Sequence, residues 1–185
     1  MTYQSIIDIF TMIEKVNARF NSSISGLSEA QENFRPAPDR WTIAENVEHI
    51  SIVNSGFLRL TYKLLKQAEA DPKPAREDLR MPPVTLTDMG EQKHGKMEAP
   101  ETVRPKGDVP VAQSVTKNQQ AIDDLIKLQP RLDPIDLSEL KWPHPFLGQL
   151  NLYQWLVLLG EHVERHRLQI EGVKSSPQFP GSSPQ

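Results

Sequence analysis

Residues 152–173 read LYQWLVLLGEHVERHRLQIEGV and form the most apolar long segment of the chain. Apolar residues recur in this segment at spacings of three and four, the periodicity of a helix that buries one face. Two polar residues lie on that face, because His162 and His166 share one stripe with Leu159 and Ile170. Residues four apart are neighbours on a helix. The segment therefore predicts a helix that carries two adjacent imidazoles toward the core.

Three earlier stretches show the same periodicity, at about residues 3–24, 42–69 and 111–128. The second of them has a clear start signal, because Thr42 and Glu45 have the spacing of a capping box. No stretch alternates convincingly between apolar and polar residues, so no β-strand is predicted. Four amphipathic helices predict an all-α fold, a four-helix bundle.

Two irregular connections separate the predicted helices. Residues 71–110 contain seven prolines and few large apolar residues. A connection of this length is unusual inside a compact domain, and we interpret it as a crossover along the bundle. It either shapes a site or is a surface excursion, and the sequence does not decide between the two. Residues 130–148 form a shorter irregular stretch. We predict one bundle domain, residues 1–173, followed by a Ser/Pro-rich tail, residues 174–185.

Composition excludes several classes of protein. The net charge is −3 and no basic block of five or more residues occurs, so nucleic acid is not an expected partner. The chain has no cysteine, which excludes a disulfide scaffold, a thiolate metal site and a cysteine nucleophile. The start lacks the pattern of a signal peptide, and no apolar run is long enough for a membrane span. We therefore expect a cytoplasmic protein with no membrane partner.

A third histidine also interrupts an apolar face. His49 lies in the second predicted helix, near the stripe that holds Ile52 and Val53. A buried polar group needs a partner. Histidines four apart are common on solvated helices, and each inward histidine could instead bond a backbone carbonyl or a carboxylate. Three histidines on core faces are better explained by one shared cation, although the sequence alone does not show that they converge.

Three segments of the chain together resemble the DinB/YfiT-like family of metalloenzymes. They are WTIAENVEHI at residues 41–50, HPFLG at residues 144–148, and residues 155–170, which end in EHVERHRLQI. The resemblance implies a four-helix bundle of up-down-down-up order with a long crossover between the second and third helices. In this family one histidine of the second helix and two of the last typically hold the metal. The corresponding residues here are His49, His162 and His166.

The resemblance implies a metal-dependent enzyme that acts on a small-molecule substrate, either a hydrolase or a low-molecular-weight-thiol transferase. Three imidazoles leave coordination positions open, and zinc or nickel suits such ligands. The ion would lower the pKa of a bound water or thiol, or polarise a substrate oxygen. The alternatives are a non-catalytic, metal-stabilised bundle in stress response or protein interaction, and a bundle with an empty site. Relatives often pair, so a homodimer is a further expectation.

Other polar residues near the predicted ligands have competing interpretations. Glu45 could act as a general base, but we favour its role in the capping box. His144 could contact substrate, but we favour packing of its loop against the bundle. Glu161 and Glu164 are expected to be solvated, or to orient an imidazole if they reach back. His94 is expected in an exposed loop.

Overall fold

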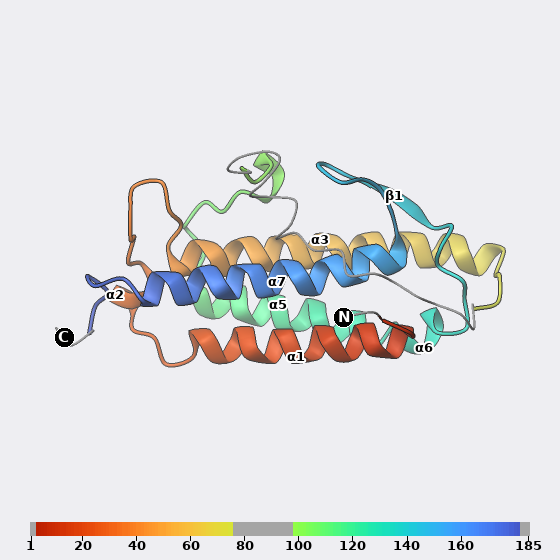
Figure 1. Ribbon diagram of the computed structural model, residues 1–185, viewed down its shortest axis with the longest axis horizontal. Coiled ribbons are helices and arrows are strands. Elements are labelled where there is room, and N and C mark those ends of the chain that lie inside the picture. Colours follow the sequence, from red (N-terminus) through yellow and green to blue (C-terminus); the bar gives the residue numbers. More distant parts are fainter. Residues whose placement is uncertain (1–2, 76–97, 182–185) are drawn as a thin grey trace.

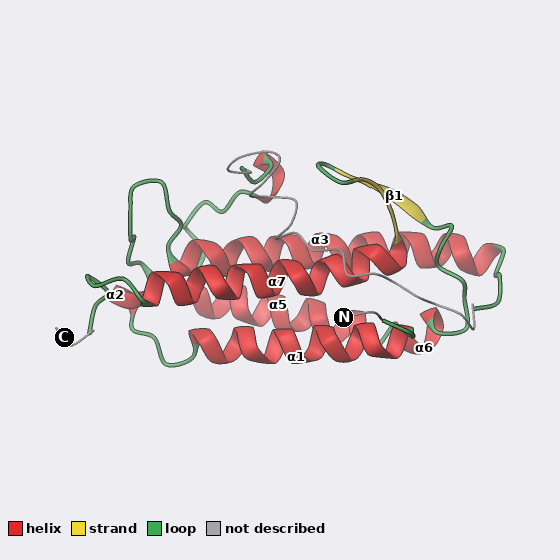
Figure 2. Ribbon diagram, viewed as in Figure 1, coloured by secondary structure: helices red, strands yellow, loops and turns green. Residues whose placement is uncertain are grey.

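The computed structural model describes residues 3–75 and 98–181 of the chain. In this part of the chain four long helices form a bundle, and short helices and one hairpin are also present; these lie at the ends of the bundle and along one side (Figures 1 and 2). The elements in chain order are α1 (Ile6–Ile24), α2 (Glu29–Glu32), α3 (Ile43–Ala70), η1 (Glu101–Val103), α5 (Val111–Ile126), α6 (Gln129–Leu132), β1 (Lys141–His144), β2 (Gly148–Asn151) and α7 (Leu152–Lys174). The predicted all-α bundle is confirmed.

The helices follow the up-down-down-up order that the resemblance implied. The colours of Figure 1 show that α1 and α7 run in one direction, whereas α3 and α5 run in the other. Because α3 and α5 are consecutive long helices that run in the same direction, the chain must return along the bundle between them. This return is the predicted long crossover, of which residues 76–97, including His94, lie outside the described part.

Three of the long helices begin at a capping box, in which the N-cap side chain and the side chain three residues on bond each other's backbone amides. The N-cap residues are Ser5 for α1, Thr42 for α3 and Asn151 for α7. The Ser5 cap makes α1 begin at Ile6, three residues later than the periodicity suggested. Helix α5 instead begins after Pro110, without a side-chain cap.

A layer of buried amides lies between the two large hydrophobic clusters of the core, and a third, small cluster contains Leu150 and Leu158. One cluster lies at the end of the bundle that includes Ile13 and Phe57, and the other at the end that includes Val16 and Ile50. Between them, Asn54 of α3 donates to Asn118 of α5 at 2.7 Å, and Asn118 donates to Asn17 of α1 at 2.9 Å. All three asparagines are at most 5% exposed. Three helices are therefore joined by hydrogen bonds through the centre of the bundle.

The hairpin of β1 and β2 was not predicted. Its strands have four residues each, too few to show a clear alternation, and β1 contains Pro143, a residue that is uncommon within strands. The hairpin is attached to α7, because Trp155 Nε1 donates to the carbonyl of Trp142 at 3.1 Å. The turn ends at Gly148, which has a φ of +73° and so suits glycine. Tertiary attachment, rather than local pattern, forms this element.

Residues after α7 continue along the end of the bundle. Phe179 is buried, and its ring meets the ring of Phe34 edge-on at 5.6 Å. Residues 182–185 lie outside the described part of the chain. None of the described helices is both long and apolar enough to cross a lipid bilayer.

Candidate metal centre

The structure brings His49 of α3 together with His162 and His166 of α7. One ring nitrogen from each of the three residues lies within 4.8 Å of the other two. The Nε2 atoms of His49 and His162 are 3.2 Å apart. The ring centroids are 4.6–5.1 Å apart in all three pairs. The predicted convergence of these residues is therefore present.

The spacing of the cluster suits a shared divalent ion. Two imidazole nitrogens bound to one tetrahedral zinc at about 2.0–2.1 Å lie about 3.3–3.4 Å apart, close to the 3.2 Å between His49 and His162. Among the described residues the cluster contains no carboxylate. The donor set is three imidazoles, which suits zinc, nickel and related metals better than magnesium or calcium.

Hydrogen bonds at Nδ1 direct two of the imidazoles. His49 Nδ1 lies 2.7 Å from the carbonyl oxygen of Val103, and His166 Nδ1 lies 2.9 Å from Oδ1 of Asn46. Both oxygens only accept hydrogen bonds, so both Nδ1 atoms carry the proton and both Nε2 atoms are unprotonated. The Nε2 of His49 can then accept a hydrogen bond from Nε2 of His162, 3.2 Å away. In contrast, Nδ1 of His162 is buried and has no partner among the described residues.

Burial keeps the cluster neutral. Burial, together with the charges of His49 and Arg165, lowers the pKa of His162 to about 3. Burial, with the neighbouring histidines, holds the pKa of His166 well below its ordinary value. Burial also lowers the pKa of His49, against the opposing effect of its hydrogen bond to Val103. Neutral imidazole is the form that binds a metal.

The ring of Trp41 covers one side of the cluster. It stacks on His166 with a centroid distance of 5.8 Å and an interplanar angle of 15°, and it lies 4.9 Å from the ring of His49. Trp41 directly precedes Thr42, the N-cap of α3, so the start of the helix determines where the indole lies. The indole therefore packs against two of the three imidazoles.

The returning crossover lies against the cluster and is held there by Glu48. This residue is only 3% exposed, and its carboxylate accepts hydrogen bonds from the backbone amides of Lys106 at 3.1 Å and Gly107 at 2.8 Å. The same loop contains η1, whose last residue, Val103, bonds His49. The described end of the crossover therefore contributes to the site. Sequence reasoning missed Glu48 because its partners lie 58 and 59 residues away.

Glu45 is committed to the start of α3. Its Oε2 accepts from the Thr42 amide at 2.8 Å, and its Oε1 is 2.7 Å from Arg35 Nη2. Burial would raise the pKa of Glu45, but the hydrogen bonds from Arg35 and Thr42 outweigh burial and lower it. The capping box that the sequence predicted is present. With both oxygens engaged, this carboxylate is poorly placed to act as a general base.

His144 holds the turn of the hairpin. Its Nδ1 accepts the backbone amides of Phe146 and Leu147, each at 3.2 Å, and its ring lies 5.2 Å from that of Trp155. Burial lowers the pKa of His144, which favours the neutral form that accepts these bonds. These contacts agree with the packing interpretation. His144 is not one of the clustered histidines.

The two glutamates beside the predicted ligands do not join the cluster. Glu164 bonds Arg167 at 2.8 Å and Arg19 at 3.3 Å, on the side of α7 that faces α1. The pKa of Glu161 is raised by burial and by the negative charge of Glu164. Neither carboxylate orients an imidazole.

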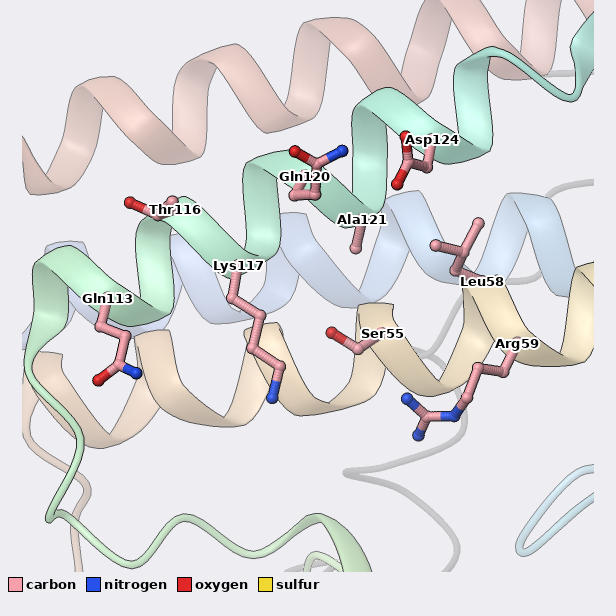
Figure 3. A pocket seen from close by; sticks show the side chains of 9 residues that line it. All are labelled: Ser55, Leu58, Arg59, Gln113, Thr116, Lys117, Gln120, Ala121 and Asp124. Carbon is pink, nitrogen blue, oxygen red and sulfur yellow. The ribbon is translucent and has the colours of Figure 1, made fainter.

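A separate surface groove runs between α3 and α5 and contains none of the three histidines (Figure 3). Its lining includes the polar side chains of Ser55, Lys117 and Gln120, but most of the lining surface is apolar. Asp124, at one end, is paired with Lys127 at 2.7 Å. The groove is thus distinct from the histidine cluster.

A bundle of this order, with three imidazoles gathered from its second and last long helices, has the architecture of a metal-binding four-helix bundle. The chain belongs to the DinB superfamily, whose family model matches residues 12–170. It is also similar to the uncharacterized protein YuaE of Bacillus subtilis (strain 168), with 25% identity over 157 residues, 83% of this chain and 89% of YuaE.

Solved structures with the same fold include TT2238, described as a four-helix bundle protein. The TM-score is 0.55 at 16% identity, over 89% of this chain and 97% of TT2238. YfiT from Bacillus subtilis, described as a probable metal-dependent hydrolase with an unusual four-helix bundle topology, gives a TM-score of 0.59 at 16% identity. That match covers 90% of this chain and 84% of YfiT. At this identity the likeness establishes the fold.

Proposed function

We propose that this protein is a metal-dependent enzyme acting on a small molecule, with one divalent ion held by His49, His162 and His166. The observation that carries the proposal is the cluster of three neutral imidazoles, of which His49 and His166 are buried and protonated at Nδ1, so that their Nε2 atoms are unprotonated. Zinc and nickel are the ions that best suit this donor set.

Three protein ligands leave coordination positions free for water or substrate, as in catalytic rather than structural metal sites. The ion would supply Lewis acidity, which lowers the pKa of a water or thiol or polarises a substrate oxygen. The chain's own residues would hold the ion, exclude bulk water through Trp41, and keep the ligands neutral through burial. The chain lacks cysteine, so the nucleophile would be water or an external thiol.

The reaction we propose is hydrolysis or transfer of a low-molecular-weight thiol. Hydrolysis is supported by the likeness of the fold to YfiT, described as a probable metal-dependent hydrolase. We further propose that the protein acts in the cytoplasm, possesses no nucleic-acid or membrane partner, and pairs as a homodimer. A non-catalytic, metal-stabilised bundle is the second candidate, because an ion bound by these residues would cross-link α3 to α7.

The experiment begins with protein purified without an affinity tag, whose metal content is measured before and after addition of zinc or nickel. We expect about one ion per chain, and its loss in both His49→Ala and His166→Ala. His144→Ala is the matched control, because this histidine lies outside the cluster. Substoichiometric metal that added ions do not restore would refute the site, as would retention in both cluster variants.

Activity is then measured on the metal-loaded protein with panels of esters and amides, and with thiol acceptors in the presence of a small thiol. Turnover that is lost on chelation and restored by the ion supports the enzyme. If the ion raises only the melting temperature across these panels, the stabilised-bundle alternative is favoured.

A further inference from the structure

We propose that Asn46 is a positioning residue that holds His166 in the tautomer and orientation needed to bind the ion. This inference rests on the proposed metal site and adds a residue that is not a ligand. Asn46 lies on α3, three residues before His49, and is 1% exposed. The same turn of α3 would thus supply one ligand directly and orient a second ligand on α7.

The orientation of the Asn46 amide is determined by its neighbours. Its Nδ2 lies 2.8 Å from the carbonyl oxygen of Thr42. A carbonyl oxygen can only accept, so the NH2 group must face Thr42, and Oδ1 must face the other way. Oδ1 then lies 2.9 Å from Nδ1 of His166. Asn46 is therefore an acceptor toward His166, which must carry its proton on Nδ1.

The point to which Asn46 is attached is itself rigid. Thr42 is the N-cap of α3, and its hydroxyl and backbone amide both bond Glu45 in the capping box. The carbonyl of Thr42 also accepts the first bond of the helix, from the Asn46 backbone amide at 3.1 Å. The amide of Asn46 thus has little freedom to rotate, and it transmits the position of the helix start to the imidazole of His166.

The two α7 histidines differ in this respect. His166 has a side-chain partner at Nδ1, whereas Nδ1 of His162 has none within the described ranges. Hydrogen-bonding partners behind metal-bound histidines typically change metal affinity by about 10–100-fold when removed. Loss of the Asn46 acceptor should free His166 to adopt the other tautomer, in which the proton on Nε2 blocks the metal.

Three variants test the inference. Asn46→Leu has a similar size and removes both hydrogen bonds. Asn46→Asp keeps an acceptor for His166, but it replaces the donor to Thr42 by an oxygen that cannot donate and adds a negative charge. Thr61→Val is the matched control, because it removes a buried polar group from the same helix, far from the cluster along α3. Zinc affinity is measured by competition with a chromophoric chelator, and ¹⁵N NMR of the metal-free protein reports the tautomer of His166.

We expect Asn46→Leu to weaken zinc binding about 10–100-fold, Asn46→Asp to remain within about tenfold of the parent, and Thr61→Val to match it. The metal-free parent should show His166 protonated at Nδ1, and Asn46→Leu should lose that preference. Equal affinity of Asn46→Leu and the parent would overturn the inference, as would Asn46→Asp binding as weakly as Asn46→Leu. If Asn46→Leu does not fold, protonation of His166 at Nε2 in the parent would overturn it. Absence of zinc binding in the folded parent would refute the proposed metal site itself. The role of Asn46 would still be tested in that case, because the tautomer of His166 is measured in the metal-free protein.

Discussion

Acidification should weaken metal binding by this protein far less than it would weaken binding by three imidazoles of ordinary pKa. A proton and a metal ion compete for the same lone pair, so affinity falls as a ligand's pKa is passed. In this protein burial lowers the pKa of all three histidines, and that of His162 to about 3. The perturbation is a change of pH from 7.5 to 5.5.

The magnitude follows from the protonation of each ligand. An imidazole of pKa about 6.5 goes from mostly neutral to mostly protonated over this range, which costs about tenfold in affinity per ligand and about 1,000-fold for three. His162, with its pKa at about 3, stays neutral at both pH values. If only this ligand were shifted the loss would be about 100-fold. Because His49 and His166 are also shifted downward, we expect a loss smaller than that.

Zinc affinity is measured at pH 7.5, 6.5 and 5.5 by competition with a chelator calibrated at each pH, with circular dichroism to show that the bundle stays folded. Nickel titration followed by Trp41 fluorescence gives an independent measure, because the indole stacks on a ligand. The Trp41→Phe variant identifies the signal. A loss approaching 1,000-fold would mean that the imidazoles titrate as they do in water, and would refute the reasoning from burial.

Three further predictions concern stability. The metal-free protein should lose stability as the pH falls from about 6.5 toward 3, because the unfolded chain then binds protons on histidines that stay neutral when folded. Urea unfolding across this pH range measures the loss, and a free energy of unfolding that does not change with pH would contradict the prediction. Glu48→Ala should lower the free energy of unfolding by about 1–3 kcal/mol, because it removes the acceptor of two loop amides, and Glu48→Gln should lower it less. In Glu48→Ala, hydrogen exchange should be faster at the amides of Lys106 and Gly107, and unchanged exchange would count against the loop contact. A Cβ at Gly160 would meet the flexible end of the Met12 side chain, which has to move aside. Because Ala is also favoured over Gly by about 1 kcal/mol inside a helix, Gly160→Ala should change stability by less than about 1 kcal/mol. In the Met12→Ala background the same change should stabilise by about 1 kcal/mol, and a cycle with no coupling energy would disprove this contact.

Local patterns predicted the long helices because the apolar periodicity and the capping residues of each helix lie within its own segment of the sequence. The capping box of Thr42 and Glu45 predicts that a helix starts directly after Thr42, and α3 starts there in the structure. The hairpin was different, since its strands depend on the bond from Trp155 to Trp142 rather than on alternation. A structure that forms only by docking onto another element leaves little periodic signal.

The site divides in the same way. His49, His162 and His166 could be predicted because histidines on apolar helix faces stand out, and the family resemblance gave their convergence. The partners of those histidines could not be predicted. Val103 reaches His49 from 54 residues away, and Asn46 reaches His166 from 120 residues away. Hydrogen bonds between residues so far apart in the sequence form only when the tertiary fold brings the residues together, so no local spacing in the sequence predicts them.

The buried amide layer explains how the two ligand-bearing helices come into register without metal. A slip of one residue shifts a helix by about 1.5 Å and turns its side chains by about 100°. Such a slip of α3 would break the bond between Asn54 and Asn118 and leave buried amides unpaired, which costs about 1–3 kcal/mol per group. Asn118 in turn bonds Asn17 of α1, and α1 packs closely against α7 where Gly160 leaves room for its neighbour. The position of α3 relative to α7 is therefore set partly through α5 and α1, and these contacts on the other side of the bundle add to the direct bonds that hold two imidazoles 3.2 Å apart.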